Sequence, residues 1–274
     1  MRNRRRGAVA LLVLGLLAGL VAAPRAEARP PSTQIIGGDP AEPGEYPFMT
    51  AILDETIAGN DYQKQYCGGS LIAANWVLTA AHCVEGERAS NLAVAVGRNQ
   101  LDSTQGVRRS VSAIFIHPSY GSPTSLAHDA ALIQLSTAVT TIAPIRLAGA
   151  ADDGYEAAGT GLTVIGWGNV NSSGSPSYPN DLQEVVVPAV SDSQCARSYG
   201  SSLDAATMLC AGATGLDSCQ GDSGGPLFAT PSSGRVQMGI VSWGNGCAKK
   251  RFPGVYSEVN NSSIRSWITA TAGV

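Results

Sequence analysis

The chain has 274 residues, with 18 lysines and arginines, 21 acidic residues, 3 histidines and 6 cysteines. Without residues 1–34, 12 basic and 20 acidic residues remain, a net charge of −8 (12 − 20) for residues 35–274. An acidic surface argues against nucleic acid as a partner, because phosphate binding needs a basic face. It fits a soluble secreted protein.

The N-terminal segment has the pattern of a secretory signal peptide. Residues 1–6 carry four arginines, residues 7–23 are apolar and uncharged, and Ala26-Glu27-Ala28 offers a small-x-small cleavage site. The apolar run is short for a membrane span, which typically needs about 20 residues. We therefore predict a signal peptide over residues 1–28, a pro-segment over 29–34 and secretion, with a membrane anchor as the alternative. Arginines 4–6 also weakly match a twin-arginine export signal.

Short β-branched runs separated by turn clusters predict an all-β protein. The predicted strands are 70–78, 92–96, 111–116, 130–135, 162–166, 182–187, 226–228, 236–242 and 254–259. Residues 143–151 are a candidate joint between two subdomains. The only helical period predicts a closing helix over 263–272, with Asn261 or Ser262 as its N-cap.

The cysteines predict a disulfide-bonded protein. All six lie after residue 34, and an even number in an exported chain favours three disulfides. Their spacing alone leaves many pairings open. Zinc is the alternative, but no close Cys-x-x-Cys pair is present.

The segment DSCQGDSGGP, residues 217–226, is the strongest candidate for a catalytic site. It places Ser223 between Asp222 and two glycines, and such small neighbours let the backbone turn sharply and expose the hydroxyl. A serine hydroxyl is a poor nucleophile by itself, so this hypothesis requires a histidine base and an acid that orients it.

Only three histidines can supply that base. His82 follows an apolar run in LTAAHC, His117 ends a predicted strand in IHPSY, and His128 precedes Asp129 in HDAALIQL. A lone histidine is usually structural. The context of His82 favours it as the base, because its motif and that of Ser223 reinforce each other.

Eight motifs in one order resemble the chymotrypsin/trypsin family of serine endopeptidases, and they span all of the mature chain. They are IIGG (35–38), CGGSLI (67–72), LTAAHC (78–83), HDAALIQL (128–135), GWG (166–168), DSCQGDSGGP (217–226), VSWGNGC (241–247) and PGVY (253–256). The resemblance implies two six-stranded antiparallel Greek-key β-barrels with a C-terminal α-helix. The barrels are expected over 35–147 and 148–274, the second including the helix.

The resemblance also implies the catalytic roles. His82 would be the general base and acid, Asp129 its orienting partner and Ser223 the nucleophile, in the chain order of chymotrypsin. The backbone N–H groups of Gly221 and Ser223 would form the oxyanion hole. These roles predict hydrolysis of peptide bonds through an acyl-enzyme.

The same resemblance implies a substrate pocket with Asp217 at its base. A buried carboxylate selects a cationic side chain, so cleavage after Lys and Arg is expected. Gly244 and Gly254 would form open walls, and Ser218 and Tyr199 would support the pocket. The remaining substrate-binding groups implied are the backbones of Ser242 and Gly244, which would pair with the substrate as an added strand, and the side chain of Trp243.

Disulfide pairing and activation follow from the resemblance in the same way. The implied disulfides are Cys67–Cys83, Cys195–Cys210 and Cys219–Cys247. Cleavage before Ile35 would free an amine that pairs with Asp222 and orders the oxyanion loop. The residue before this bond is Gln34, which a pocket containing Asp217 should not accept. We therefore expect an activating protease of different specificity.

Expected partners are protein or peptide substrates and proteinaceous protease inhibitors, with no nucleic acid and no membrane, for a monomer without cofactor. Calcium is not expected in the loop 98–109, where three arginines accompany a single acid, Asp102. Asn171 begins a candidate glycosylation sequon, and residues 260–263 hold another. The alternative function is that of an inactive homologue acting as a binding protein, which the complete triad opposes.

Overall fold

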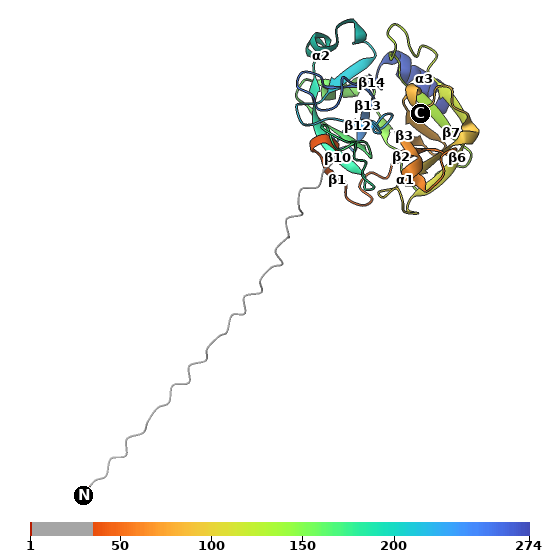
Figure 1. Ribbon diagram of the computed structural model, residues 1–274. Helices are drawn as coiled ribbons and strands as arrows, with labels where there is room; N and C mark the ends of the chain where they lie inside the picture. The colour runs from red at the N-terminus through yellow and green to blue at the C-terminus, as the bar shows by residue number, and fades with distance from the viewer. Residues whose placement is uncertain (2–34) are drawn as a thin grey trace. The chain divides into compact units, whose positions relative to one another are not determined.

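The computed structural model describes residue 1 and residues 35–274. The predicted signal peptide, the pro-segment and Gln34 lie outside the described residues, apart from Met1. Two β-barrels make up the described chain (Figure 1). No described helix is long and apolar enough to cross a membrane.

The first barrel is a closed sheet of six antiparallel strands in the order β2-β3-β4-β7-β6-β5. Its strands are β2 (Met49–Asp54), β3 (Gln65–Ala73), β4 (Trp76–Thr79), β5 (Leu92–Val96), β6 (Val107–Ile116) and β7 (Ala131–Leu135). Most of β2 and all of β5 are buried, so these strands are nearly continuous apolar runs. In β6, exposed residues alternate with less exposed ones along its first half, as on a sheet with one solvated face.

The second barrel closes because β10 pairs with both β11 and β9. Its strands are β9 (Gly161–Gly166), β10 (Gln183–Val190), β11 (Met208–Ala211), β12 (Pro226–Ala229), β13 (Val236–Trp243) and β14 (Gly254–Glu258). Two short strands join this sheet: β1 (Asp39–Pro40) pairs with β10, and β8 (Arg146–Leu147) runs parallel to β13. The predicted class, two six-stranded antiparallel barrels with a C-terminal helix, is confirmed.

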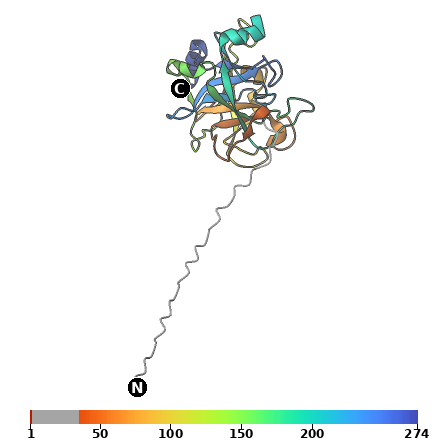
Figure 2. The ribbon, with the colours of Figure 1, turned by 90° about the vertical axis from the view of Figure 1, so that its left-hand side faces the viewer.

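Three α-helices lie outside the barrels: α1 (Asp61–Lys64), α2 (Asp192–Tyr199) and α3 (Ser262–Ala272). The Asn261 side chain caps α3 by accepting hydrogen bonds from the N–H groups of Ser263 and Ile264, at 3.0 and 3.1 Å. Helix α3 buries Ile264 and Ile268 in the apolar cluster that also contains the core of the first barrel. The helix that follows the second barrel in sequence therefore packs against the first (Figures 1 and 2).

The predicted joint contacts both barrels in turn. The N–H of Ile145 donates to the carbonyl of Leu71 in the first barrel, at 2.9 Å. Three residues later, the N–H of Ala148 donates to Gln237 in the second barrel, at 3.0 Å. A buried hydrogen bond from Ser70 Oγ to Gln237 Oε1, 2.6 Å, also joins the barrels. The site described below lies where they meet.

One predicted strand is two strands in the structure. Residues 70–78 form two strands, because the chain reverses at residues 74 and 75 and β3 pairs antiparallel with β4. The reversal contains Asn75, a residue type that favours turns. Strands β1, β2, β8 and β11 and helices α1 and α2 were not predicted.

Candidate active site

Paired strands bring His82 and Asp129 together. His82 lies in a 3₁₀ turn (Ala81–Cys83) after β4, and Asp129 lies just before β7, the partner of β4. His82 Nδ1 is 2.7 Å from Asp129 Oδ2, and the backbone N–H of His82 donates to Asp129 Oδ1 at 2.9 Å. Asp129 is fully buried, whereas the His82 side chain is 27% exposed. The carboxylate thus holds Nδ1 as the donor and leaves Nε2 on the accessible side of the ring.

A hydroxyl from the second barrel also holds Asp129. Ser242 Oγ, at the end of β13, donates a short hydrogen bond to Asp129 Oδ2. The sequence pointed only to the backbone of Ser242 as a substrate contact, so this role of its side chain was missed. In the sequence, Ser242 is visible only as the serine of the VSWGNGC motif, which does not indicate a contact with Asp129. The contact depends on how the two barrels meet.

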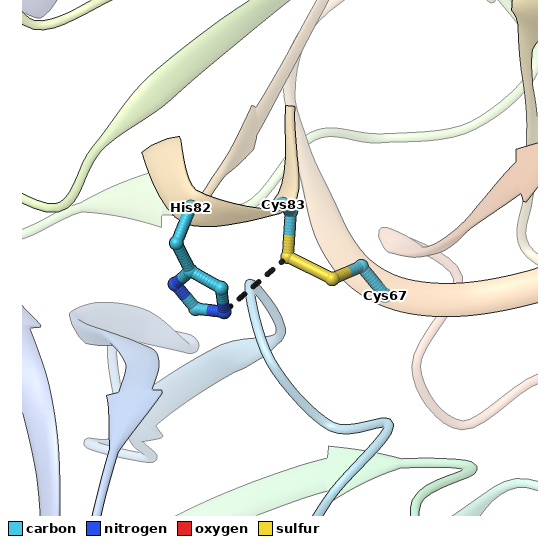
Figure 3. A group of neighbouring side chains, drawn as sticks. All are labelled: Cys67, His82 and Cys83. Atoms are coloured by element: carbon cyan, nitrogen blue, oxygen red, sulfur yellow. Dashed lines mark hydrogen bonds between the residues drawn. A yellow bond between two sulfur atoms is a disulfide. The ribbon is translucent and has the colours of Figure 1, made fainter. Parts of the chain in front are cut away.

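Ser223 lies in the loop between β11 and β12, and the first barrel holds its backbone. The N–H of Gly68, in β3, donates to the Ser223 carbonyl at 2.7 Å. Ser223 lines the same pocket as Asp217. Within the described residues no hydrogen bond joins Ser223 Oγ to His82 Nε2, whose recorded contact is the sulfur of Cys83 at 3.8 Å (Figure 3). Such hydrogen bonds are often long in enzymes without substrate.

Two backbone N–H groups beside Ser223 are available to a ligand. The N–H groups of Gly221 and Ser223 donate to no other group of the described chain. Gly221 has φ +98°, a conformation that L side chains rarely adopt. Its carbonyl accepts a hydrogen bond from Gln65 Nε2 at 3.0 Å, a support that the sequence did not reveal. The peptide that carries the Gly221 N–H is held on its other side, because its Gln220 carbonyl accepts from the N–H of Asn169 at 2.7 Å, while the bond from Gln65 fixes the following peptide.

Asp217 lies at the base of a pocket of about 230 Å³. Its side chain is almost fully buried, and Oδ2 accepts a hydrogen bond from the N–H of Ala248 at 2.8 Å. Oδ1 is buried and has no hydrogen-bond partner in the described chain. Burial raises the pKa of Asp217 to about 7, and the hydrogen bond from Ala248 offsets this rise only in part. Oδ1 is thus the oxygen of this carboxylate that still lacks a partner within the described chain.

The predicted wall residues line this pocket, with differing contacts. A Cβ on Gly254 would lie 2.6 Å from Asp217 Oδ1, so any side chain there would cover the carboxylate. Trp243 and Gly244 also line the pocket. Ser218 Oγ lies 3.2 Å from the Tyr256 hydroxyl. Tyr199 is not a lining residue; its hydroxyl donates to the Pro253 carbonyl at 2.5 Å, behind the wall.

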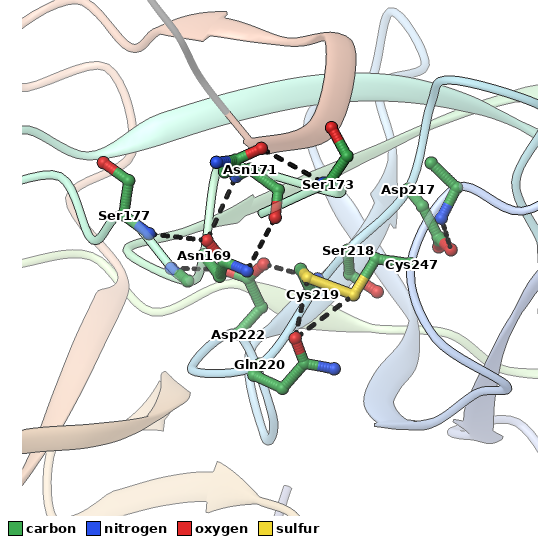
Figure 4. Close-up of a disulfide and its surroundings, with 12 residues drawn as sticks. Asn169, Asn171, Ser173, Ser177, Asp217, Ser218, Cys219, Gln220, Asp222 and Cys247 are labelled. Carbon is green, nitrogen blue, oxygen red and sulfur yellow. Dashed lines mark hydrogen bonds between the residues drawn. A yellow bond between two sulfur atoms is a disulfide. The ribbon is translucent and has the colours of Figure 1, made fainter. Parts of the chain in front are cut away.

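Asp222 is fully buried and accepts two backbone hydrogen bonds, from Gly168 N to Oδ1 and from Cys219 N to Oδ2, both at 2.8 Å (Figure 4). A Cβ on Gly166 or Gly168 would lie within 2.1 or 2.5 Å of this carboxylate, which gives the GWG motif a physical role. Burial raises the pKa of Asp222 to about 7. Ile35 is also fully buried, but the described contacts of the Asp222 carboxylate are with these two N–H groups.

The structure contains the three disulfides that the resemblance implied. Cys67–Cys83 ties the His82 turn to β3, and Cys219–Cys247 joins the Ser223 loop to the opposite side of the pocket (Figures 3 and 4). Among the described residues one group has metal-ligand spacing, Cys67, His82 and Cys83. Its sulfurs form a disulfide and His82 is paired with Asp129, so this group does not fit a metal site.

Ion pairs hold the loop 98–109, for which the sequence predicted no calcium site. Arg98, which is almost fully buried, and Arg108 both contact the carboxylate of Asp61 in α1. Arg108 also pairs with Glu55, which in turn pairs with Lys64 at 3.3 Å. Guanidinium groups therefore provide positive charge in this loop.

A protein-family model described as "Trypsin" matches residues 35–268. The chain belongs to the trypsin family. It is 40% identical over 242 residues to trypsin delta of Drosophila melanogaster, covering 87% of this chain and 88% of that protein. Trypsin-1 of Astacus astacus is 39% identical over 248 residues, covering 87% and 100%. Trypsin of Saccharopolyspora erythraea is 39% identical over 227 residues, covering 82% and 93%. The protein is thus a serine endopeptidase that acts on proteins or peptides.

Proposed function

We propose that this trypsin-family protein is a secreted endopeptidase that hydrolyses peptide bonds after arginine and lysine. The observation that carries the proposal is the buried Oδ1 of Asp217, which has no hydrogen-bond partner among residues 35–274, in a pocket that Ser223 also lines. A substrate guanidinium or ammonium supplies the missing partner. An apolar side chain leaves the carboxylate buried and unpaired, which costs about 3–5 kcal/mol when one member of such a pair is absent.

Hydrolysis proceeds through Ser223, His82 and Asp129. The Ser223 hydroxyl attacks the substrate carbonyl carbon while its proton passes to His82 Nε2, and Asp129 stabilises the resulting imidazolium. The N–H groups of Gly221 and Ser223 donate to the oxyanion. His82 then protonates the leaving amine, and the C–N bond breaks. Water attacks the acyl-enzyme by the same proton route, releasing the acid and free Ser223.

Activation begins with cleavage between Gln34 and Ile35. The new α-amine of Ile35 pairs with Asp222 and fixes the loop that carries Gly221. The raised pKa of Asp222 supports this, because a fully buried carboxylate with only backbone donors is poorly stabilised as an anion. Since the Asp217 pocket selects cations, a protease of another specificity cleaves after Gln34. The predicted signal peptide supports secretion of the precursor, and proteinaceous inhibitors are further partners.

Kinetics with matched peptide anilides test this function. The activated enzyme should hydrolyse Arg and Lys anilides with kcat/KM at least about a hundredfold above that for Phe. Asp217→Ser should abolish this preference while Ser223 still reacts with a phosphonate. A Phe anilide hydrolysed as fast as the Arg anilide would refute the pocket assignment. No reaction of native Ser223 with the phosphonate would favour an inactive binding protein instead.

A further inference from the structure

Four exposed basic side chains lie outside the site described so far. Arg197 is in the last turn of α2, and Lys249, Lys250 and Arg251 follow Cys247 in the loop before β14. None of the four forms an ion pair with a described residue. Of the other eight basic residues in 35–274 (12 − 4), five do: Lys64, Arg98, Arg108, Arg146 and Arg235. In a chain with a net charge of −8 over residues 35–274, this is an unpaired positive region.

The two arginines of this group, Arg197 and Arg251, line a single pocket of about 540 Å³, called here the basic pocket. Its lining residues are Gln194, Arg197, Ser198, Arg251 and Phe252. The pocket therefore combines two guanidinium groups with an amide, a hydroxyl and an aromatic face. Helix α2, which supplies one side of it, lies at the periphery of the molecule (Figures 1 and 2). Guanidinium groups bind carboxylates through paired, parallel hydrogen bonds.

The backbone of this pocket is held in a disfavoured conformation. Arg251 has φ +73°, in the left-handed region that residues with a Cβ rarely occupy. Ser198 Oγ, from α2, donates to the Arg251 carbonyl, and the N–H of Phe252 donates to the Lys249 carbonyl at 3.1 Å. The turn is thus fixed to α2, which brings the side chains of Arg197 and Arg251 to one pocket.

Aromatic contacts connect the basic pocket to the substrate pocket. The ring of Tyr199 lies 5.7 Å from Phe252 and 4.7 Å from Trp243, which lines the Asp217 pocket. An extended peptide rises about 3.3 Å per residue, so these two steps span about three residues. Trp243 would cover the subsite next to the one for the cleaved residue, so the count starts there. A substrate that pairs with Ser242 and Gly244 would then reach the basic pocket about four to six residues before the cleaved bond.

We propose that the basic pocket is a secondary substrate-binding site, which takes acidic side chains of a polypeptide about four to six residues before the cleaved bond. Arg197 and Arg251 bind the carboxylates, and Lys249 and Lys250 add long-range attraction. The enzyme therefore favours proteins in which an acidic segment precedes the basic residue. This site extends the proposed function and rests on it for the direction in which the substrate lies.

Two peptides that differ only in charge test the proposal. Both carry Arg at the cleaved position, with Glu in one and Gln in the other at the fourth to sixth positions before the bond. The Glu peptide should have a kcat/KM about five- to tenfold higher, and about 0.5 M salt should remove most of the difference. Arg197→Gln and Arg251→Gln should each lower the advantage about two- to fivefold. Arg197→Lys should retain part of it.

Arg88→Gln is the matched control, because Arg88 is exposed, lines none of the described pockets and changes the net charge equally. It should leave the advantage unchanged, and all variants should hydrolyse a short Arg anilide like the native enzyme. Equal rates for the two peptides, or an equal loss with Arg88→Gln, would overturn the proposal. A single-stranded oligonucleotide that competes better than an oligoglutamate of equal charge would overturn the assignment to polypeptide.

Failure of the proposed function would look different. In that case the native enzyme would not hydrolyse the short Arg anilide at all. The basic pocket is then tested by equilibrium binding of the same two peptides to the Ser223→Ala protein. Tighter binding of the Glu peptide supports the proposal if the added substitution Arg251→Gln removes that preference. Equal binding of the two peptides refutes it.

Discussion

Replacing Asp217 by asparagine should stabilise the protein while it damages the substrate pocket. Asp217 is 2% exposed, and only one of its oxygens has a hydrogen-bond partner in the described chain. Asparagine has the same shape, and its amide oxygen can still accept from the N–H of Ala248. The substitution therefore removes a poorly stabilised buried charge without creating a cavity.

The size and pH dependence of this effect follow from the pKa of Asp217. Burial raises that pKa from 3.8 to about 7. Because the folded pKa is the higher one, the unfolded chain loses its proton first as pH rises. The native protein is therefore destabilised progressively between about pH 4 and pH 7, and fully above that. A difference of about three pH units corresponds to about 4 kcal/mol of unfolding free energy.

Urea unfolding of the two proteins at several pH values measures this difference. Both should carry Ser223→Ala, so that self-digestion does not intervene. At about pH 8, Asp217→Asn should be more stable by about 4 kcal/mol, and at about pH 4 the two proteins should be equal. Asp39→Asn, at an exposed carboxylate, controls for the change in net charge. A gain that is the same at both pH values, or a loss at pH 8, would refute the reasoning.

Three other substitutions test contacts between the barrels and the backbone strain beside Asp129. Ser242→Ala removes a donor to Asp129 and should lower kcat about tenfold with little change in KM, as steady-state kinetics would show; an unchanged kcat would contradict this role. Ser70→Ala leaves the Oε1 of buried Gln237 without the Ser70 donor and should lower the unfolding free energy by about 1–3 kcal/mol, measured in urea. His128 has φ +54°, so His128→Val should lower the melting temperature by calorimetry, at a cost of about 1–2 kcal/mol, whereas His128→Gly should retain more stability.

The strands that were predicted from sequence are those with a clear apolar run between turn residues. Leu92–Val96 was predicted at its observed bounds, because five small or branched apolar residues are all buried. Strand β11, with the sequence MLCA, was missed because none of its four residues is β-branched or aromatic. Helix α2 was missed because Cys195 is its only buried residue, so it has no apolar stripe.

The motifs located the residues of the candidate site but not the contacts between them. Neighbouring strands explain why His82 meets Asp129, and a sequence pattern can suggest such a pair. The hydrogen bonds from Ser242 to Asp129 and from Gln65 to Gly221 join residues 113 and 156 positions apart. They depend on how one barrel meets the other, which no local pattern encodes. The basic pocket was not predicted for the same reason, because α2 and a distant loop form it together.

Asp217 and Asp222 are buried in the same loop, and their negative charges repel each other. Each has a pKa raised to about 7 mainly by burial, and the charge of Asp222 adds to the rise at Asp217. In the proposed mechanism each carboxylate receives its own cation, a substrate side chain at Asp217 and the Ile35 amine at Asp222. A cation at Asp222 cancels the repulsion and favours ionised Asp217, so cleavage before Ile35 should tighten binding of cationic ligands. By linkage, a ligand bound at Asp217 must favour insertion of the Ile35 amine to the same extent.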